Sequence, residues 1–391
     1  MSQIFTISPG PLLHFGEGKI SQLPDTIRTY GSKFLLVTGA SSFVSSPYFE
    51  MLSEQFASAG LTFMQWSVRG EPTPGLVDDA VRDSRSFNPD VVVAIGGGSA
   101  LDAGKAISAM IPLAESVEHY LEGIGSKSHP GSKVPFIAIP TTAGTGSEAA
   151  RNAVLSQTGP TGYKRSLRHN NFVPNVAILD PMLALTCPKE TTAATGMDAF
   201  TQLLESYLSP AGNRITDAIA MEGLSLIPSS LITAFRDGSD LNARAGMALA
   251  AYLSGVTLTN AGLGLIHGFA SSIGGFFPIA HGVICSALMA PVNILTVRKL
   301  RSKNDTIALK KYATAGKIFS NINGGRSDNY YIDTLLETIQ AWTAEMNIPP
   351  LREGGVASHD FDRIISVTDN KNNPIALNRE EMAEVLEWGR A

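Results

Sequence analysis

Four residues combine ligand-type side chains with a spacing that could build a metal centre. Asp198 and Gln202 are four residues apart in a helix-like segment, so both side chains can face one pocket. His267 and His281 bracket a glycine-rich segment further along the chain. Carboxylate and imidazole groups bind divalent metals, whereas an amide oxygen binds iron or zinc more weakly than imidazole does. The set predicts metal-assisted polarisation of a bound oxygen atom, with Gln202 as its weakest ligand.

A glycine run in the first half of the chain could hold a phosphate. The apolar residues 91–95 lead into the glycines 96–98, and Ser99 and Asp102 stand at the start of the next helix-like segment. Glycines let the backbone approach a ligand closely, and free amides at a helix start favour an anion. The alternative is a tight strand-to-helix turn that binds nothing.

A second loop, residues 140–148, follows the apolar residues 136–139 and is rich in glycine and hydroxyl side chains. It matches the G-x-G-x-x-[GA] pattern, but the acidic ribose partner expected about twenty residues later is missing. A basic run, residues 164–169, stands there instead. The hydroxyl groups suit a sugar or an amide, and the alternative is an ordinary turn rich in serine and threonine.

The elements that must position these residues fall into two kinds. The first half alternates apolar runs, expected to be buried parallel strands, with helix-like segments. The strands are expected at residues 34–37, 61–68, 91–95, 136–139 and 176–179, and the helices between them at 48–59, 75–87 and 100–110. After Asp180 and Pro181 the segments are long and helix-like. We therefore predict a Rossmann-like α/β dinucleotide-binding domain at residues 1–183 and an all-helical metal and substrate domain at 184–391.

Composition excludes several classes of protein. The 391 residues are 44% hydrophobic and 17% charged, as expected of a folded chain with two domains. A net charge of −5 gives no reason to expect nucleic acid or a membrane as partner. Cys187 and Cys285 form no close-spaced motif, which rules out a disulfide framework. The N-terminus lacks a secretory pattern, and the longest apolar candidate, residues 249–277, is broken by glycine and asparagine. A cytoplasmic protein without membrane spans is expected.

Together, four motifs resemble those of the iron-containing (group III) alcohol dehydrogenases. They are residues 96–105, 140–148, 196–199 and the histidine segment 267–282. Their order and spacing agree with the family over nearly the whole chain. The resemblance implies the dehydroquinate synthase-like, two-domain architecture, with hydride transfer in the cleft between the domains. It implies NAD(P)-linked oxidation of an alcohol or reduction of an aldehyde or ketone. It also implies iron or zinc as the metal and a homodimer or larger homo-oligomer.

The resemblance assigns roles residue by residue. The pyrophosphate of the cofactor would lie against Gly96, Gly97, Gly98, Ser99 and Asp102. The nicotinamide and its ribose would be lined by Thr141, Thr142 and Thr145, and Lys164 would reach a ribose. Asp198, His267 and His281 match three of the four family metal ligands, and the two histidines are the expected catalytic residues.

The chain departs from the family pattern at three positions. Gln202 stands at the fourth ligand position, where the family has histidine. Ser271 replaces a second family histidine, and Thr73 replaces an asparagine between two prolines. Two interpretations follow. Either a weakened metal site persists, or the metal is absent and His267 and His281 stabilise the developing alkoxide directly, in a way similar to maleylacetate reductases.

Cofactor and substrate preferences follow from two further features. NAD-preferring members often carry an aspartate after the first strand of the dinucleotide fold, and this chain has Gly39 there, with Ser42 nearby. Acceptance of or preference for NADPH is therefore expected. The basic run, with Arg151, indicates either a solvated or subunit-contact surface or recognition of an anionic small substrate. Two alternatives from other classes are a dehydroquinate synthase-like lyase and a non-catalytic dinucleotide-binding protein.

Overall fold

The computed structural model describes residues 4–320, 322 and 324–391, and it divides into two compact units. The α/β unit comprises Ser8–Gln157 and Lys164–Cys187. The helical unit comprises Thr158–Tyr163 and Pro188–Ala391, together with residues 4–7. The expected boundary after residue 183 thus lies near the observed one after Cys187. The inclusion of Thr158–Tyr163 in the helical unit was not foreseen.

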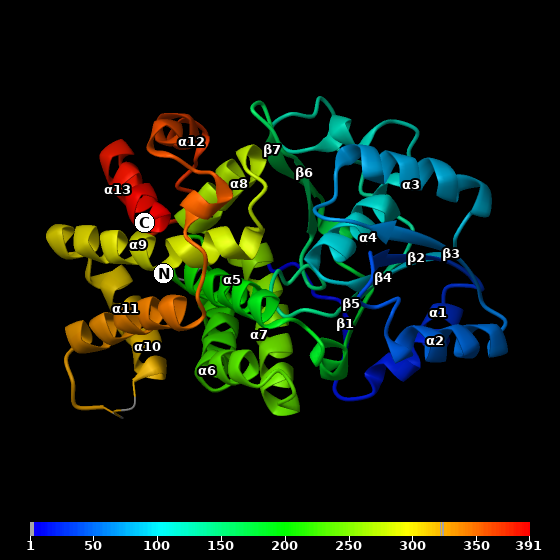
Figure 1. The fold of residues 1–391 in the computed structure, drawn as a ribbon, viewed down its shortest axis with the longest axis horizontal. Helices are drawn as coiled ribbons and strands as arrows, with labels where there is room; N and C mark the ends of the chain where they lie inside the picture. Colours follow the sequence, from blue (N-terminus) through cyan, green and yellow to red (C-terminus); the bar gives the residue numbers. More distant parts are fainter. Residues whose placement is uncertain (1–3, 321, 323) are drawn as a thin grey trace. The chain divides into compact units, whose positions relative to one another are not determined.

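The α/β unit is built on a six-stranded parallel sheet with the order β1-β8-β5-β4-β2-β3 (Figure 1). The strands are β1 (Leu12–Phe15), β2 (Lys33–Gly39), β3 (Thr62–Val68), β4 (Val91–Gly96), β5 (Phe136–Pro140) and β8 (Val176–Leu179). Strands β4 and β8 are buried along their whole length, because helices cover both faces of the sheet. The prediction of a parallel α/β fold is confirmed, and β1 is an additional edge strand.

Four helices cover the two faces of this sheet. They are α1 (Leu23–Arg28), α2 (Pro47–Ser58), α3 (Pro74–Phe87) and α4 (Gly98–Met110). Figure 1 shows α1 and α2 on one face and α3 and α4 on the other. Apolar residues of α1 and α2 pack against Phe34, Leu36 and Val93 in one continuous core. Two further strands, β6 (Asn152–Gln157) and β7 (Tyr163–Arg168), pair in a separate small sheet. The sequence did not predict them.

The helical unit contains the remaining long helices. They are α5 (Lys189–Leu208), α6 (Arg214–Arg236), α7 (Leu241–Ala261), α8 (Leu265–Phe276), α9 (His281–Lys303), α10 (Thr306–Phe319), α11 (Asp328–Glu345), α12 (Phe361–Val367) and α13 (Arg379–Arg390). Helix α5 packs against α6, α7 and α9, and α9 also packs against α8 and α13. This central position of α5 and α9 buries the residues that they carry. The predicted all-helical second half is confirmed.

Two of these helices bear on the expectation that the chain has no membrane span. By length and composition, α6 and α9 could each cross a membrane, and α7 with α8 would be a third candidate if that pair, bent by 98°, were one span. The sequence search missed them because it required an uninterrupted apolar run, whereas a helix tolerates a few polar residues. In the structure, 50% of the apolar window of α6 and 78% of that of α9 are buried within the protein. Packing therefore accounts for much of their apolar character.

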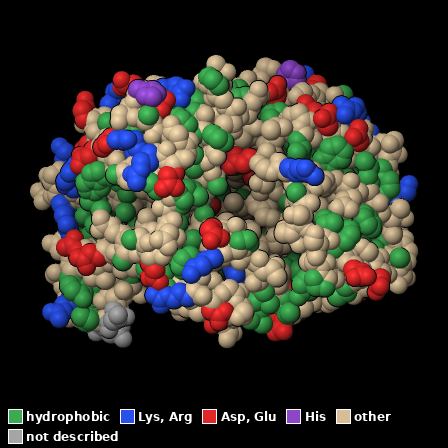
Figure 2. Space-filling view, in the orientation of Figure 1, with side chains coloured by type: hydrophobic (Ala, Val, Ile, Leu, Met, Phe, Trp, Pro, Cys, Tyr) green, Lys and Arg blue, Asp and Glu red, His purple; other side chains and the backbone are tan. Residues whose placement is uncertain are grey.

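Surface charge agrees with the modest net charge of the chain. On the face drawn in Figure 2, acidic and basic side chains are interspersed. This mixture leaves no large basic field on this face that would attract nucleic acid. Charged side chains also pair, as Arg298 does with Glu384, but exposed pairs of this kind contribute little stability.

Candidate active site

The candidate metal centre is built by three helices of the helical unit. Helix α5 carries Asp198, α8 carries His267 near its start, and α9 begins at His281. Gly282 allows α9 to begin close to α5, because a β-carbon there would lie only 2.4 Å from the carbonyl oxygen of Ala194. Gly282 is thus required for packing, because the close approach of α9 to α5 brings the imidazole of His281 to Asp198.

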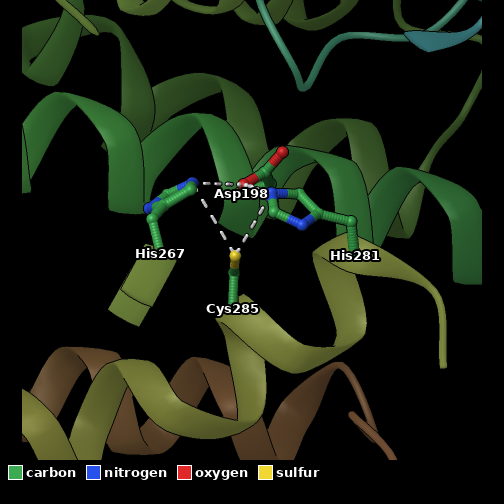
Figure 3. Close-up of side chains that lie close together, drawn as sticks. All are labelled: Asp198, His267, His281 and Cys285. Atoms are coloured by element: carbon green, nitrogen blue, oxygen red, sulfur yellow. Dashed lines mark hydrogen bonds and ion pairs between the residues drawn. The ribbon is translucent and has the colours of Figure 1, made fainter. Parts of the chain in front are cut away.

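The structure brings Asp198, His267 and His281 together and adds Cys285 to them (Figure 3). One ligand atom from each of the four residues lies within 4.8 Å of the others. Asp198 Oδ1 is 3.3 Å from His267 Nε2 and 3.7 Å from His281 Nε2. Cys285 Sγ is 3.8 Å from His267 Nε2 and 3.7 Å from His281 Nε2. The four side chains surround one point from different sides.

The residues present fit a divalent metal. Asp198 Oδ1 is buried and makes no hydrogen bond, although two imidazole nitrogens lie near it. A buried carboxylate oxygen without a donor is costly, and a cation between it and the imidazoles would remove that cost. Asp198 and His267 are almost completely buried, whereas the side chain of His281 is 24% exposed. His281 therefore marks the side from which a small molecule can reach the centre.

Glu205 holds His267 in the orientation that metal binding requires. Its Oε2 lies 2.7 Å from His267 Nδ1, and its Oε1 accepts a hydrogen bond from the amide of Ile266 at 2.8 Å. With Nδ1 committed to the carboxylate, Nε2 is the nitrogen that faces Asp198 and Cys285. This is the carboxylate–histidine arrangement common around bound metals. Sequence reasoning missed Glu205, although it lies seven residues after Asp198 and so on the same face of α5.

Gln202 is placed differently from the expected ligand. Its Oε1 lies 2.8 Å from the hydroxyl of Ser254, and its side chain hydrogen-bonds to the carboxyl of Asp198. The amide oxygen therefore faces Ser254 of α7, and the amide nitrogen donates to the carboxyl of Asp198, the proposed metal ligand. In this structure Gln202 supports Asp198 within the buried part of α5.

The electrostatics of the cluster favour a positive charge at its centre. Burial alone would raise the pKa of Asp198, but the charges of the neighbouring His281 and His267 bring it to about 2. Burial alone would lower the pKa of His267, but Cys285, Glu205 and Asp198 raise it well above its usual value. Burial raises the pKa of the Cys285 thiol to about 11. Asp198 is thus kept ionised inside the protein, where a bound cation can neutralise its charge.

The two predicted phosphate loops lie side by side at the carboxyl ends of β4 and β5. Gly96 pairs with Pro140 in the sheet, and the amide of Thr141 donates to the carbonyl of Gly96. Gly98, at the start of α4, lies so close to Thr145 that a β-carbon would be 2.5 Å from its methyl group. Thr142 lies beside Gly97, where a β-carbon would be at an ordinary contact distance of 3.4 Å. Gly98 thus allows the threonine-rich loop to pack against the start of α4.

The strand order places a topological switch point next to these loops. Strand β2 pairs with β3 on one side and with β4 on the other, so the chain reverses direction across the sheet between β3 and β4. Ligands of doubly wound sheets bind at the carboxyl ends of strands beside such a point. Gly39 ends β2 there, and Ser42 is exposed in the loop that follows. The free amides at the start of α4, Gly98 and Ser99 among them, lie at the same edge.

Two expected cofactor contacts have other partners in this structure. Asp102 is half-buried, and its carboxyl accepts hydrogen bonds from the hydroxyl of Ser147 at 2.5 Å and the amide of Val154 at 3.1 Å. Lys164 forms an ion pair with Glu71. Asp102 therefore ties α4 to the second loop and to β6, while Lys164 links β7 to the segment that precedes α3.

The basic run, residues 164–169, lies mostly in strand β7, and two of its charges are paired, Lys164 with Glu71 and Arg168 with Glu122 at 3.3 Å. Outside the run, Arg151 donates to Asn170 at 2.6 Å. His169 accepts a hydrogen bond from the amide of Asn171 and packs against Phe172. These contacts favour the surface interpretation of the run over recognition of an anionic substrate.

The family is decided by comparison with known proteins. Models of the iron-containing alcohol dehydrogenases match residues 11–181, and models of the C-terminal region of the same family match residues 192–388. Alcohol dehydrogenase 4 of Saccharomyces cerevisiae is 31% identical over 99% of this chain and 98% of its own. The chain belongs to the iron-containing alcohol dehydrogenase family. The resemblance predicted from the four motifs is confirmed, and the chain is an oxidoreductase acting on CH–OH groups.

Two further relatives agree with this assignment. The NADPH-dependent butanol dehydrogenase of Clostridium saccharobutylicum is 30% identical over 96% of this chain and 95% of its own. The crystal structure of a 1,3-propanediol oxidoreductase is similar with a TM-score of 0.89, at 30% identity over 99% of this chain and 100% of that chain. The likeness spans both units of this alcohol dehydrogenase.

Two departures from the family motifs have local explanations in this alcohol dehydrogenase. Thr73 caps α3, because its hydroxyl accepts a hydrogen bond from the amide of Leu76 at 3.1 Å. Ser271 donates to the carbonyl of His267, one turn earlier in α8, at 2.9 Å. Thr73 therefore stabilises the start of α3, and the hydroxyl of Ser271 bonds to the backbone within α8.

Replacement of Glu205 by glutamine tests its positioning role. The oxygen of the new amide can still accept from the backbone amide of Ile266, which turns the amide nitrogen toward His267 Nδ1. The imidazole must then carry its proton on Nε2, the nitrogen that faces the centre. We expect Glu205→Gln to bind a divalent metal about 10–100-fold more weakly, as measured by chelator competition. Glu222→Gln, on the exposed face of α6, is the control, and equal metal affinity in both variants would contradict the role.

Proposed function

We propose that this enzyme interconverts a small alcohol and its aldehyde or ketone with NAD(P) as hydride acceptor or donor, assisted by a divalent metal. The observation that carries the proposal is the convergence of Asp198, His267 and His281 around one buried point in a member of this family. Carboxylate and imidazole donors with a carboxylate-oriented histidine are typical of catalytic metal centres. The three residues come from three different helices, so their closeness is not a trivial result of being near one another in the sequence.

Each group in the site then has a defined task. A bound divalent metal, iron or zinc, would polarise the alcohol or carbonyl oxygen of the substrate. Asp198, His267 and His281 would hold it, with Glu205 fixing the first histidine. The amides around Gly97, Gly98 and Ser99 would bind the pyrophosphate, and Thr141, Thr142 and Thr145 would line the nicotinamide and its ribose. His281 and His267 are the residues proposed to lie nearest the reacting oxygen.

Acceptance of NADPH is the second part of the proposal. At position 39, where an aspartate would repel a 2′-phosphate, stands a glycine at the end of β2, and the following loop exposes Ser42. The clostridial relative is named as an NADPH-dependent butanol dehydrogenase. A hydroxyl-bearing loop without a carboxylate suits the extra phosphate.

The substrate is proposed to be a small neutral alcohol. The names of the relatives, a butanol dehydrogenase and a 1,3-propanediol oxidoreductase, support this choice. The alternative of an anionic substrate would require Arg168 of β7 and the nearby Arg151 to leave their present partners, Glu122 and Asn170. A substrate panel distinguishes the two choices, since higher rates with carboxylated or phosphorylated aldehydes than with neutral ones would favour the anionic alternative.

Removal of the metal tests the proposed mechanism. Purified enzyme is analysed for iron and zinc, stripped with a chelator and assayed by NAD(P)H absorbance against neutral and charged aldehydes. We expect activity to fall by about a hundredfold or more on stripping and to return when zinc or iron is added. Full activity of the stripped enzyme would instead support direct stabilisation of the alkoxide by His267 and His281. Turnover without net change in NAD(P)H would indicate a lyase.

A cytoplasmic homo-oligomer is also proposed. Strand β1 is an edge of the sheet, bonded within the α/β unit to β8, and its Leu12 is 62% exposed. Phe15 of the same strand is partly exposed as well. An edge strand with exposed apolar side chains is a natural place for pairing with a second chain. Light scattering of the purified protein tests this, and a monomer at micromolar concentration would contradict it.

A further inference from the structure

We propose that Cys285 is the fourth protein ligand of the metal centre and makes the centre selective for zinc. It takes the place of the histidine that the family has at position 202. The completed ligand set is Asp198, His267, His281 and Cys285. The inference deepens the metal-dependent part of the proposed function and rests on it.

The distances between the side chains fit one tetrahedral ion. Donor atoms bound to a single zinc, with nitrogen or oxygen at about 2.0–2.2 Å and sulfur at about 2.3 Å, lie about 3.3–3.7 Å from one another. Cys285 Sγ is 3.7 and 3.8 Å from the Nε2 atoms of His281 and His267. Asp198 Oδ1 is 3.3 and 3.7 Å from the Nε2 atoms of His267 and His281. Four of the six separations are thus close to those of a bound ion, and the other two are at most 4.8 Å.

Cys285 is tied to the cluster by its place in α9 as well as by distance. It lies four residues after His281, so the sulfur and the imidazole project from the same face of one helix. The cysteine is completely buried, and Figure 3 shows its sulfur directed at the histidines and Asp198. The buried Asp198 Oδ1, which makes no hydrogen bond, points into the same space. A cation there would contact both atoms.

Gln202 leaves the fourth position open. Its amide oxygen faces the hydroxyl of Ser254, and its side chain bonds to Asp198. The substitution has thus turned a ligand position into a support for a ligand, while a sulfur occupies another corner of the cluster. The thiolate of Cys285, from α9, would supply the donor that Gln202, from α5, does not.

The donor set determines which metal is favoured. Thiolate is a soft ligand that suits zinc, whereas carboxylate and imidazole accept zinc and iron alike. When Zn²⁺ binds, a sulfur–zinc bond forms and the thiol proton is released to solvent, with no change in oxidation state. The substrate oxygen would enter as a fifth ligand from the side of His281, whose side chain is partly exposed.

Cobalt substitution tests the thiolate ligand directly. Co²⁺ replaces zinc and gives an intense near-ultraviolet charge-transfer band only when a thiolate is bound. The chain has two cysteines, so Cys187→Ser leaves Cys285 as the single thiol and is the matched control. We expect the band in the wild type and in Cys187→Ser, and its loss in Cys285→Ser. We also expect zinc affinity at least about tenfold weaker in Cys285→Ser, by chelator competition.

A second variant keeps the test decisive if Cys285→Ser folds poorly. The double variant Gln202→His with Cys285→Ala restores the family ligand and removes the sulfur. We expect it to recover zinc affinity over Cys285→Ala alone while showing no charge-transfer band. An enzyme that binds one equivalent of cobalt without this band, or a band that survives in Cys285→Ser, overturns the proposal. If such an enzyme still loses activity on stripping, the metal-dependent function stands and only the cysteine ligand falls.

Discussion

Asp198→Asn is expected to lower kcat/KM for alcohol oxidation by about a thousandfold or more, because charge stabilisation by a bound metal is worth several kcal/mol. Asparagine keeps the shape of the side chain but removes the negative charge that faces both imidazoles, at 3.3 and 3.7 Å. The variant is expected to retain its fold, since asparagine has nearly the volume of aspartate and its oxygen can still accept the hydrogen bond from Gln202. Metal content and steady-state kinetics are the measurements.

The control for this variant is Asp360→Asn. Asp360 is also buried in the helical unit, but it pairs with Arg363 and accepts from the amide of Ala357, and it is not part of the metal cluster. Its replacement should cost stability without loss of metal. The affinity for NADPH, measured by fluorescence, should be unchanged in Asp198→Asn because the proposed cofactor loops belong to the α/β unit. An Asp198→Asn enzyme with wild-type kcat/KM would refute metal assistance.

The parts of the fold that follow from local pattern could be predicted from the sequence. Strands such as β4 and β8 are continuous apolar runs, and their burial on both faces is what a parallel sheet requires. Strand β1 is four residues long and lies at the sheet edge, where its pattern is too short to read. Strands β6 and β7 show no regular alternation of polar and apolar residues, and β7 is rich in charge, so their pairing decides their structure more than their propensity does.

Long-range contacts set the limits of prediction for the units. The segment Thr158–Tyr163 belongs to the helical unit because the amide of Gly159 donates to the carbonyl of Gly275, and Gly275 packs against Tyr163. These partners are more than a hundred residues apart in the sequence. No local pattern in the sequence indicates such a contact. Sequence analysis therefore predicted one boundary near residue 183 and not a unit made of separate segments.

The candidate site was predicted in part, and the missing residues were within reach of helical spacing. Asp198, His267 and His281 stand out by residue type and motif. Glu205 is seven residues from Asp198, and Cys285 is four from His281, so each shares a helix face with a recognised residue. Sequence reasoning treats the cysteine only as a disulfide partner. Which way the amide of Gln202 points depends on a serine in α7, and the sequence does not give that.

Gly39→Asp is expected to shift the ratio of kcat/KM values for NADPH and NADH toward NADH by about a hundredfold, the effect of roughly 3 kcal/mol of like-charge repulsion. Gly39 ends β2 beside the switch point of the sheet, and a β-carbon there would meet no atom within 4 Å. Its backbone is extended strand, so aspartate can be accommodated without strain. The new carboxylate would face the position proposed for the 2′-phosphate and could instead accept hydrogen bonds from the ribose of NADH.

Gly39→Asn separates charge from size in this experiment. Asparagine has nearly the volume of aspartate and can also bond a ribose hydroxyl, but it does not repel a phosphate. The ratio should therefore move much less in Gly39→Asn than in Gly39→Asp, and most of the change in the aspartate variant should appear in the KM for NADPH. Raising the ionic strength should reduce the difference between the two variants, because the repulsion acts at a partly exposed site. Equal shifts of the kcat/KM ratio in both variants would mean that position 39 acts through packing. A wild type that already strongly favours NADH would contradict the proposed position of the 2′-phosphate beside Gly39.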